Sequence, residues 1–161
     1  ISGGKSQGID STTRDAYVYY KELHDRKNAR MQPTTGGLKF MSIEKDMVRI
    51  ACKALDDKKA KDIKIIDIHE VSVIADYFVI ASASNQNQVQ AMVDNVDETL
   101  GRAGFEAKQI EGTRNSSWVL MDYGDMIIHI FDEENRLFYD LERIWRDGKI
   151  LDAEEFLGEN E

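Results

Sequence analysis

The sequence predicts a single α/β domain in which a mixed sheet of about five strands is flanked by helices. Segments with apolar residues at helical spacing alternate with short runs rich in β-branched residues. A length of 161 residues suits one compact core. The apolar runs are all shorter than the ~18 residues that a membrane-spanning helix needs. We therefore expect a cytoplasmic protein with no membrane partner.

Helices are predicted where apolar residues recur every three or four positions. The first runs from an N-cap at Ser42 to about Lys59, the second spans 85–103, and the last starts at acidic residues 132–134. The chain from Asp152 onward is acidic and is expected to be mobile. The last helix is expected to bury an apolar stripe, namely Leu137, Phe138, Leu141, Ile144 and Trp145.

The predicted strands are 63–68, 77–82, 106–111, 117–122 and 125–131. The last two should form a hairpin, because Asp and Gly between them tolerate the positive backbone angles of a tight turn. Alternation places Trp118, Leu120 and Asp122 on one face of the first hairpin strand, with Val119 and Met121 on the other.

Residues 1–40 differ in composition from the rest and are expected to form an extension outside the domain. They hold two Gly-Gly pairs and the single proline, Pro33. A natural protein that starts at Met41 would explain this change in composition. The extension is then either a product of cloning or of the gene model, or a short docked helix over 12–30 with Tyr17, Tyr20 and His24 on one side. We expect the domain to span 41–157 and an acidic tail to span 158–161.

Charge is divided unevenly along the chain, whose net charge is −9. Residues 1–40 hold seven Lys or Arg against four Asp or Glu, and the remainder holds fourteen against twenty-six. An acidic body is a poor candidate for direct nucleic-acid binding, because nucleic acids are polyanions. The expected partner is a basic protein, toward which the opposite charge accelerates association.

Two segments were weighed as parts of an enzyme site. Residues 82–86 follow a strand and open a helix, where hydroxyls and backbone amides can hold phosphate. The glycine that lets a backbone approach phosphate is missing, so capping of the helix by Ser84 or Asn85 is the preferred interpretation. The second segment is the hairpin turn, whose acidic residues are candidate magnesium ligands: Asp122 and Asp125, joined by Asp67 or Asp76.

The spacing of the two turn carboxylates suits hairpin geometry better than convergence on one cation. Catalytic and nucleotide-binding motifs are missing, and no Ser or Cys has a His and a carboxylate at a recognisable spacing. His129 in an apolar strand favours a structural role, and His69 and His24 are expected at the surface. Cys52 is predicted to be a buried thiol, since it lies on an apolar helix face. We expect no enzyme activity, cofactor or metal.

Aromatic residues beside carboxylates are good interface anchors, because the ring supplies buried area and the charge selects a basic partner. Trp118 fits this role, but it fits equally well as a sheet residue packed under a helix. Tyr123 lies in the turn and is expected to be exposed.

Four motifs occur in the order in which the ribosomal silencing factor family, also called Iojap-like, has them, and the chain resembles that family over roughly 41–157. They are Ala-Asp-Tyr-Phe-Val-Ile-Ala at 75–81, Ser-Asn-Gln-Asn-Gln-Val-Gln at 84–90, Glu-Gly at 111–112 before Trp-Val-Leu-Met-Asp-Tyr-Gly-Asp at 118–125, and Arg-Leu-Phe-Tyr-Asp-Leu-Glu-Arg-Ile-Trp at 136–145.

The resemblance implies a nucleotidyltransferase-like sheet fold and a factor that represses translation when nutrients are short. Such factors bind the large ribosomal subunit through its fourteenth protein and sterically block joining of the small subunit. Carried onto this chain, it implies contact residues Trp118, Asp122, Tyr123, Asp125 and Met126, with Asp76 and Tyr77 as neighbours. A metal-dependent nucleotidyl enzyme and an adaptor for another basic protein remain alternatives. Exposed strand edges are compatible with a homodimer off the ribosome.

Overall fold

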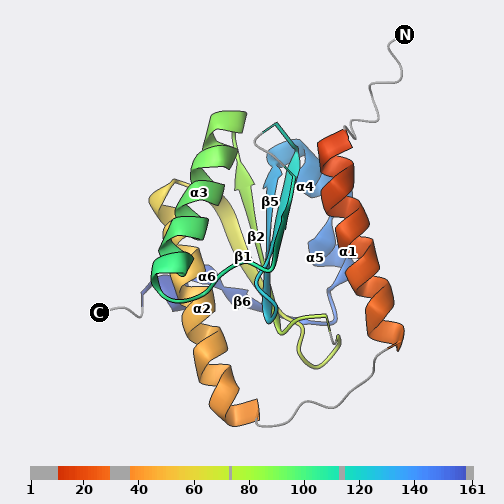
Figure 1. The fold of residues 1–161 in the computed structure, drawn as a ribbon, viewed down its shortest axis with the longest axis vertical. Helices are drawn as coiled ribbons and strands as arrows, with labels where there is room; N and C mark the ends of the chain where they lie inside the picture. Colours follow the sequence, from red (N-terminus) through yellow and green to blue (C-terminus); the bar gives the residue numbers. More distant parts are fainter. Residues whose placement is uncertain (1–10, 30–36, 73, 113–114, 159–161) are drawn as a thin grey trace.

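A computed structural model describes residues 11–29, 37–72, 74–112 and 115–158. Within them, one mixed sheet of six strands has helices on both faces, which confirms the predicted α/β class (Figure 1). The described helices include none long and apolar enough to cross a membrane. The strands are β1 Lys61–Asp67, β2 Tyr77–Ala83, β3 Gln109–Glu111, β4 Trp118–Asp122, β5 Met126–Asp132 and β6 Lys149–Asp152.

The strand order is β3-β4-β5-β2-β1-β6, and β2 and β5 are parallel while the other pairs are antiparallel. The two parallel strands lie at the centre and every residue of β2 is buried. A strand covered on both faces needs apolar side chains in both directions, as the continuous apolar run of β2 provides. The predicted hairpin is confirmed, since β4 pairs with β5 across the turn.

One face of the sheet is covered by α2 (Gly37–Asp57), α3 (Gln86–Arg102) and α6 (Ala153–Leu157). We call it the aliphatic face, because its sheet residues include Val79, Val119, Met121, Ile128 and Ile130. The apolar stripes predicted for α2 and α3 pack here. The thiol of Cys52 in α2 is fully buried, and this burial raises its pKa to about 12.

The opposite face is covered by α1 (Ser11–Ala29), α4 (Glu133–Tyr139) and α5 (Leu141–Ile144) (Figure 1). We call it the aromatic face, because Phe78, Trp118, His129 and Phe131 bring their rings together there with Leu120. The alternation predicted along β4 is therefore confirmed, with Trp118 and Leu120 on this face.

The last predicted helix is not continuous. Asp140 adopts a left-handed backbone conformation, with φ of 50°, and separates α4 from α5. The break changes the rotation of the following residues about the helix axis, so one apolar stripe cannot extend through both helices. Leu141 and Trp145 are buried as expected. The expected burial of the other three is wrong, because Leu137, Phe138 and Ile144 are 80%, 65% and 52% exposed.

Two further sequence expectations are corrected. Helix α2 starts at Gly37, so Ser42 lies inside the helix and is not its N-cap. The chain after Asp152 is not simply a mobile tail, because Asp152 caps α6, in which Ala153 and Phe156 are buried. Short amphipathic segments of this size give little periodic signal, and β6 was missed for the same reason. Residues 159–161 of the predicted tail lie outside the described residues.

Candidate partner-binding site

The turn between β4 and β5 is built by local hydrogen bonds. The backbone N–H of Tyr123 donates to the carbonyl of Met126 at 2.9 Å. Gly124 has φ of +88°, a left-handed conformation that glycine adopts without steric cost. Its N–H donates to the Asp122 carboxylate at 2.8 Å. One acidic residue predicted as a partner contact therefore also stabilises its own turn.

This turn is attached to the start of β2. The backbone N–H groups of Asp76 and Tyr77 both donate to the carbonyl of Asp125, at 2.8 and 3.0 Å. The N–H of Ile68, just after β1, donates to the carbonyl of Asp76 at 2.8 Å. The ends of the β1–β2 connection and the distant β4–β5 turn thus meet at one end of the sheet. Two predicted contacts, Asp76 and Asp125, lie side by side.

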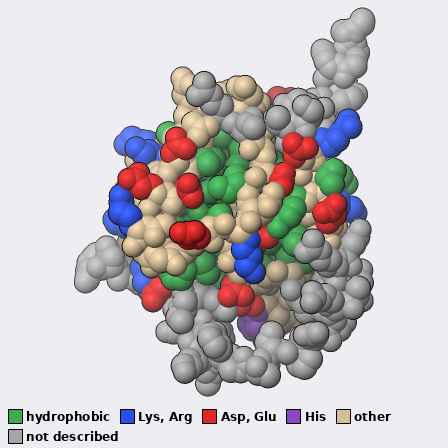
Figure 2. Space-filling model, in the orientation of Figure 1, with side chains coloured by type: hydrophobic (Ala, Val, Ile, Leu, Met, Phe, Trp, Pro, Cys, Tyr) green, Lys and Arg blue, Asp and Glu red, His purple; other side chains and the backbone are tan. Residues whose placement is uncertain are grey.

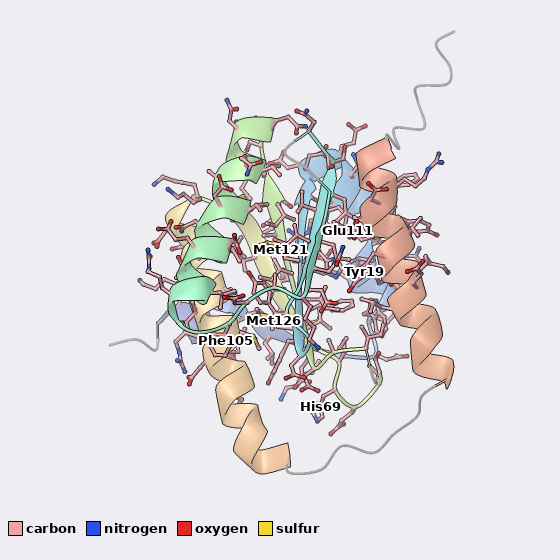
Figure 3. All side chains as sticks on the ribbon, in the orientation of Figure 1. Tyr19, His69, Phe105, Glu111, Met121 and Met126 are labelled. Atoms are coloured by element: carbon pink, nitrogen blue, oxygen red, sulfur yellow. The ribbon has the colours of Figure 1, made fainter. Side chains whose placement is uncertain are left out.

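Four acidic residues lie where these segments meet. We call this surface the acidic corner and define it by Asp67, Glu70, Asp76 and Asp125. His69 lies among them at the edge of the molecule (Figure 3), and its Nδ1 is 2.6 Å from the Asp67 carboxylate. This hydrogen bond, together with the nearby negative charges, raises the pKa of His69. The corner thus favours positive charge, as expected of a surface for a basic partner.

Most of the other predicted contact residues are buried. Trp118 and Met126 are fully buried, and Tyr77, Asp122 and Tyr123 are 2%, 5% and 7% exposed. The expectation that Tyr123 is exposed is wrong. Its ring continues the alternation of β4 into the core of the aliphatic face, and burial raises the pKa of its hydroxyl. The tip of the turn is formed instead by Gly124 and Asp125.

Of the two interpretations of Trp118, interface anchor or sheet residue packed under a helix, the structure shows the second. Its indole N–H donates to Nδ1 of His129 at 3.1 Å, and its ring contacts those of Phe131 and Tyr139. Since Nδ1 accepts this bond, the proton of the neutral His129 ring lies on Nε2. Complete burial lowers the pKa of His129 to about 3. The structural role predicted for His129 is confirmed.

Sequence reasoning assigned no function to the extension, yet α1 reaches the site. The hydroxyl of Tyr19 extends toward the sheet (Figure 3) and donates to the Asp122 carboxylate at 2.6 Å. The regular spacing of aromatic residues in 12–30 was the available signal, and the helix predicted there is present as α1. Which sheet residue it meets could not be read from the sequence, because the two are 103 positions apart.

The segments weighed for enzyme chemistry have structural partners. Ser82 is buried and its hydroxyl accepts from the Arg136 guanidinium at 2.9 Å. Capping by Asn85 is confirmed, because its side chain accepts from the N–H of Gln88 at 2.8 Å. Among the described residues, no three or more His, Cys, Asp or Glu side chains converge as ligands of one metal ion.

Acidic side chains are also spread over the face that Figure 2 shows, among Lys and Arg side chains. A hollow of about 580 Å³ opens between α3 and β3, on the other side of the turn from the acidic corner. Its lining includes Asp97, Glu106 and Lys108 but no histidine, serine or cysteine. It therefore offers charged groups without a nucleophile and base pair.

A family model described as "Ribosomal silencing factor during starvation" matches residues 41–161. A relative named "Ribosomal silencing factor RsfS" from Bacillus subtilis is 36% identical over 111 residues, which are 69% of this chain and 94% of that protein. A mouse relative named "Mitochondrial assembly of ribosomal large subunit protein 1" is 29% identical over 73% of this chain and 52% of its own length.

A crystal structure of a Bacillus halodurans protein superposes with a TM-score of 0.59 at 31% identity, covering 66% of this chain and 97% of that one. The matched family segment includes the β4–β5 turn and all four residues of the acidic corner. The six-stranded fold and the sequence match agree, and the chain belongs to the ribosomal silencing factor family.

Proposed function

We propose that this protein acts in the cytoplasm as a repressor of translation that binds the large ribosomal subunit through its fourteenth protein. Bound there, it blocks joining of the small subunit by occupying space at the subunit interface. The family match over 41–161 is the observation that carries this proposal. The name of the mouse relative, which refers to the ribosomal large subunit, supports the choice of subunit.

The acidic corner supports a basic partner. Asp125 is exposed at the tip of the turn and Asp76 beside it is partly exposed, so both can meet a cation without rearrangement of the backbone. Charge pairs across such an interface accelerate association and select the partner. The overall charge of −9 adds long-range attraction to basic ribosomal proteins.

Steric exclusion requires no catalytic group, only affinity and bulk. The fraction of large subunits that is blocked follows from mass action between the two particles. Because the attraction is electrostatic in part, we expect weaker binding as the salt concentration rises.

The test is co-sedimentation with isolated large and small subunits, using the full chain and Asp125→Lys. We expect salt-sensitive binding of the parent to large subunits alone and a loss of at least ten-fold in affinity for the variant. A matched control is Asp94→Lys, which reverses an exposed charge on α3, away from the turn. Equal binding by parent and Asp125→Lys would remove the acidic corner from the interface, and no binding by the parent would contradict the proposed function.

A further inference from the structure

Helix α1 lies on the aromatic face, where it contacts the residues that the family resemblance assigns to partner binding. Ala16 is fully buried and Tyr20 is 5% exposed. The ring centroid of Tyr20 is 5.8 Å from that of Trp118 and 6.1 Å from that of His129. The indole N–H of Trp145 donates to the Tyr20 hydroxyl at 2.9 Å. The helix is therefore seated by specific contacts and not merely adjacent.

The same helix also occupies a carboxylate of the proposed site. The Tyr19 hydroxyl donates to Asp122 at 2.6 Å, while the other carboxylate oxygen accepts from Gly124. Hydrogen bonds to a charged acceptor are stronger than neutral ones. With α1 seated, the Trp118 ring and the Asp122 carboxylate both face a segment of the same chain, and a partner cannot reach either of them.

Helix α1 lies outside the part of the chain that defines the family, which begins at residue 41. The Bacillus subtilis relative matches this chain over 111 residues, which are 94% of its own length. In this chain α1 therefore precedes the family segment and packs on the aromatic face of the sheet that this segment forms.

The contacts of α1 with the domain come from one side of the helix. Val18, Lys21 and Glu22 are exposed, whereas Ala16 and Tyr20 are buried against the aromatic face. Tyr17 also contacts this face, because its ring centroid is 6.2 Å from that of Trp118. Within residues 14–24, Arg14 and Lys21 are balanced by Asp15 and Glu22, so apolar and aromatic contacts, not net charge, seat the helix.

We propose that α1 is an intramolecular cover of the ribosome-binding surface, a regulatory role that rests on the proposed function. Seated, α1 blocks Trp118 and Asp122; displaced, it releases the aromatic face to the large subunit. The apparent dissociation constant equals the intrinsic one divided by the fraction of molecules with α1 displaced. Any event that changes the fraction of molecules with α1 displaced would then regulate ribosome binding.

The test compares the parent with Ala16→Glu, Tyr19→Phe and Val18→Glu as full chains, measuring dissociation constants for purified large subunits at one salt concentration. A glutamate at the buried position 16 should unseat α1, whereas the same charge at Val18, which is 45% exposed, should leave it seated. Hydrogen exchange of the backbone amides of 14–24 reports unseating independently of ribosome binding.

We expect Ala16→Glu to bind at least ten-fold tighter than the parent, Tyr19→Phe several-fold tighter and Val18→Glu equally. Fast exchange of 14–24 in Ala16→Glu without tighter binding would overturn the cover while leaving the proposed function intact. If neither the parent nor any variant binds large subunits, the proposed function fails and the cover falls with it. If Ala16→Glu shows no cooperative thermal transition, it is not folded and the test rests on Tyr19→Phe, which keeps the ring. Binding of Tyr19→Phe to large subunits that is no tighter than that of the parent would then overturn the cover.

Discussion

The two faces of the sheet are closed in different ways. On the aliphatic face, α2, α3 and α6 bury Val, Ile, Leu and Met side chains whose stabilisation is non-directional. The aromatic face contains hydrogen bonds between side chains, such as Trp118 to His129 and Trp145 to Tyr20. Part of its cover, α1, comes from outside the segment that matches the family. A face made of rings with polar atoms can pack against its own chain or against another protein.

The largest expected effect is on the aromatic face. Trp118→Ala removes a fully buried indole and leaves the Nδ1 acceptor of His129 without its donor. We expect the free energy of unfolding to fall by about 3–5 kcal/mol, measured by urea denaturation. The matched control is Phe138→Ala, an aromatic residue that is 65% exposed, for which a change within about 0.5 kcal/mol is expected. Equal losses in the two variants would mean that the aromatic face is not a core.

Next in size is the effect of Arg136, which pairs α4 with α5 and binds β2 on the aromatic face. The Arg136 guanidinium is 2.9 Å from the Glu142 carboxylate and donates to the buried Ser82 hydroxyl at 2.9 Å. Arg136→Met leaves both groups without this partner, and we expect a loss of about 2–3 kcal/mol. Arg143→Met breaks an exposed pair with Asp140 and is expected to cost less than about 0.5 kcal/mol.

Thermal unfolding of these two arginine variants checks the contrast. A large drop in Tm for Arg136→Met with none for Arg143→Met would show that the pair stabilises the fold because it is desolvated. Similar small drops would mean that water screens both pairs and that α4 is held by apolar contacts alone.

The third difference between the faces is sensitivity to acid. Burial keeps His129 neutral in the folded protein and lowers its pKa to about 3, whereas an unfolded chain takes up the proton below about pH 6.5. Protons therefore favour the unfolded state, and stability falls as the pH is lowered through this window. Between pH 6.5 and 5 we expect a loss of about 2 kcal/mol from this residue.

The measurement is the free energy of unfolding from pH 7 to 5 for the parent and for His129→Gln, whose amide can still accept from Trp118. The variant should lose less stability over this range. His69, with a raised pKa, has the opposite sign, because its contribution is present at low pH and is lost as the pH rises through its folded pKa. If the free energy of unfolding changes with pH equally in the parent and the variant, His129 is not desolvated in the folded protein.

Local patterns were sufficient to predict much of the fold. The alternation in β4, the helical stripe of α3 and the Asn85 cap depend on neighbours within a few residues, so the sequence contains the complete signal. The break at Asp140 was missed, because a left-handed residue inside an apolar stripe leaves the periodicity almost unchanged. Leu137 and Phe138, in the helix that ends at this break, were predicted to be buried and are exposed.

The predicted contact residues also divide into those that local patterns placed correctly and those that depend on distant contacts. Composition indicated an acidic surface, and Asp125 is exposed where the turn was predicted. Trp118 had two equally supported interpretations from periodicity. Its burial depends on Tyr20 and Tyr139, residues distant in the sequence that pack on its ring.

By itself the sequence determined the fold class, the β4–β5 hairpin, the acidic charge and, through four ordered motifs, the family. These follow from short-range spacing and composition, which a linear chain records directly. Tertiary structure alone decided which side chains of the predicted site are exposed and that α1 covers the aromatic face. Both depend on contacts between residues far apart in the chain, such as Tyr19 with Asp122, because folding, and not spacing along the chain, brings such partners together.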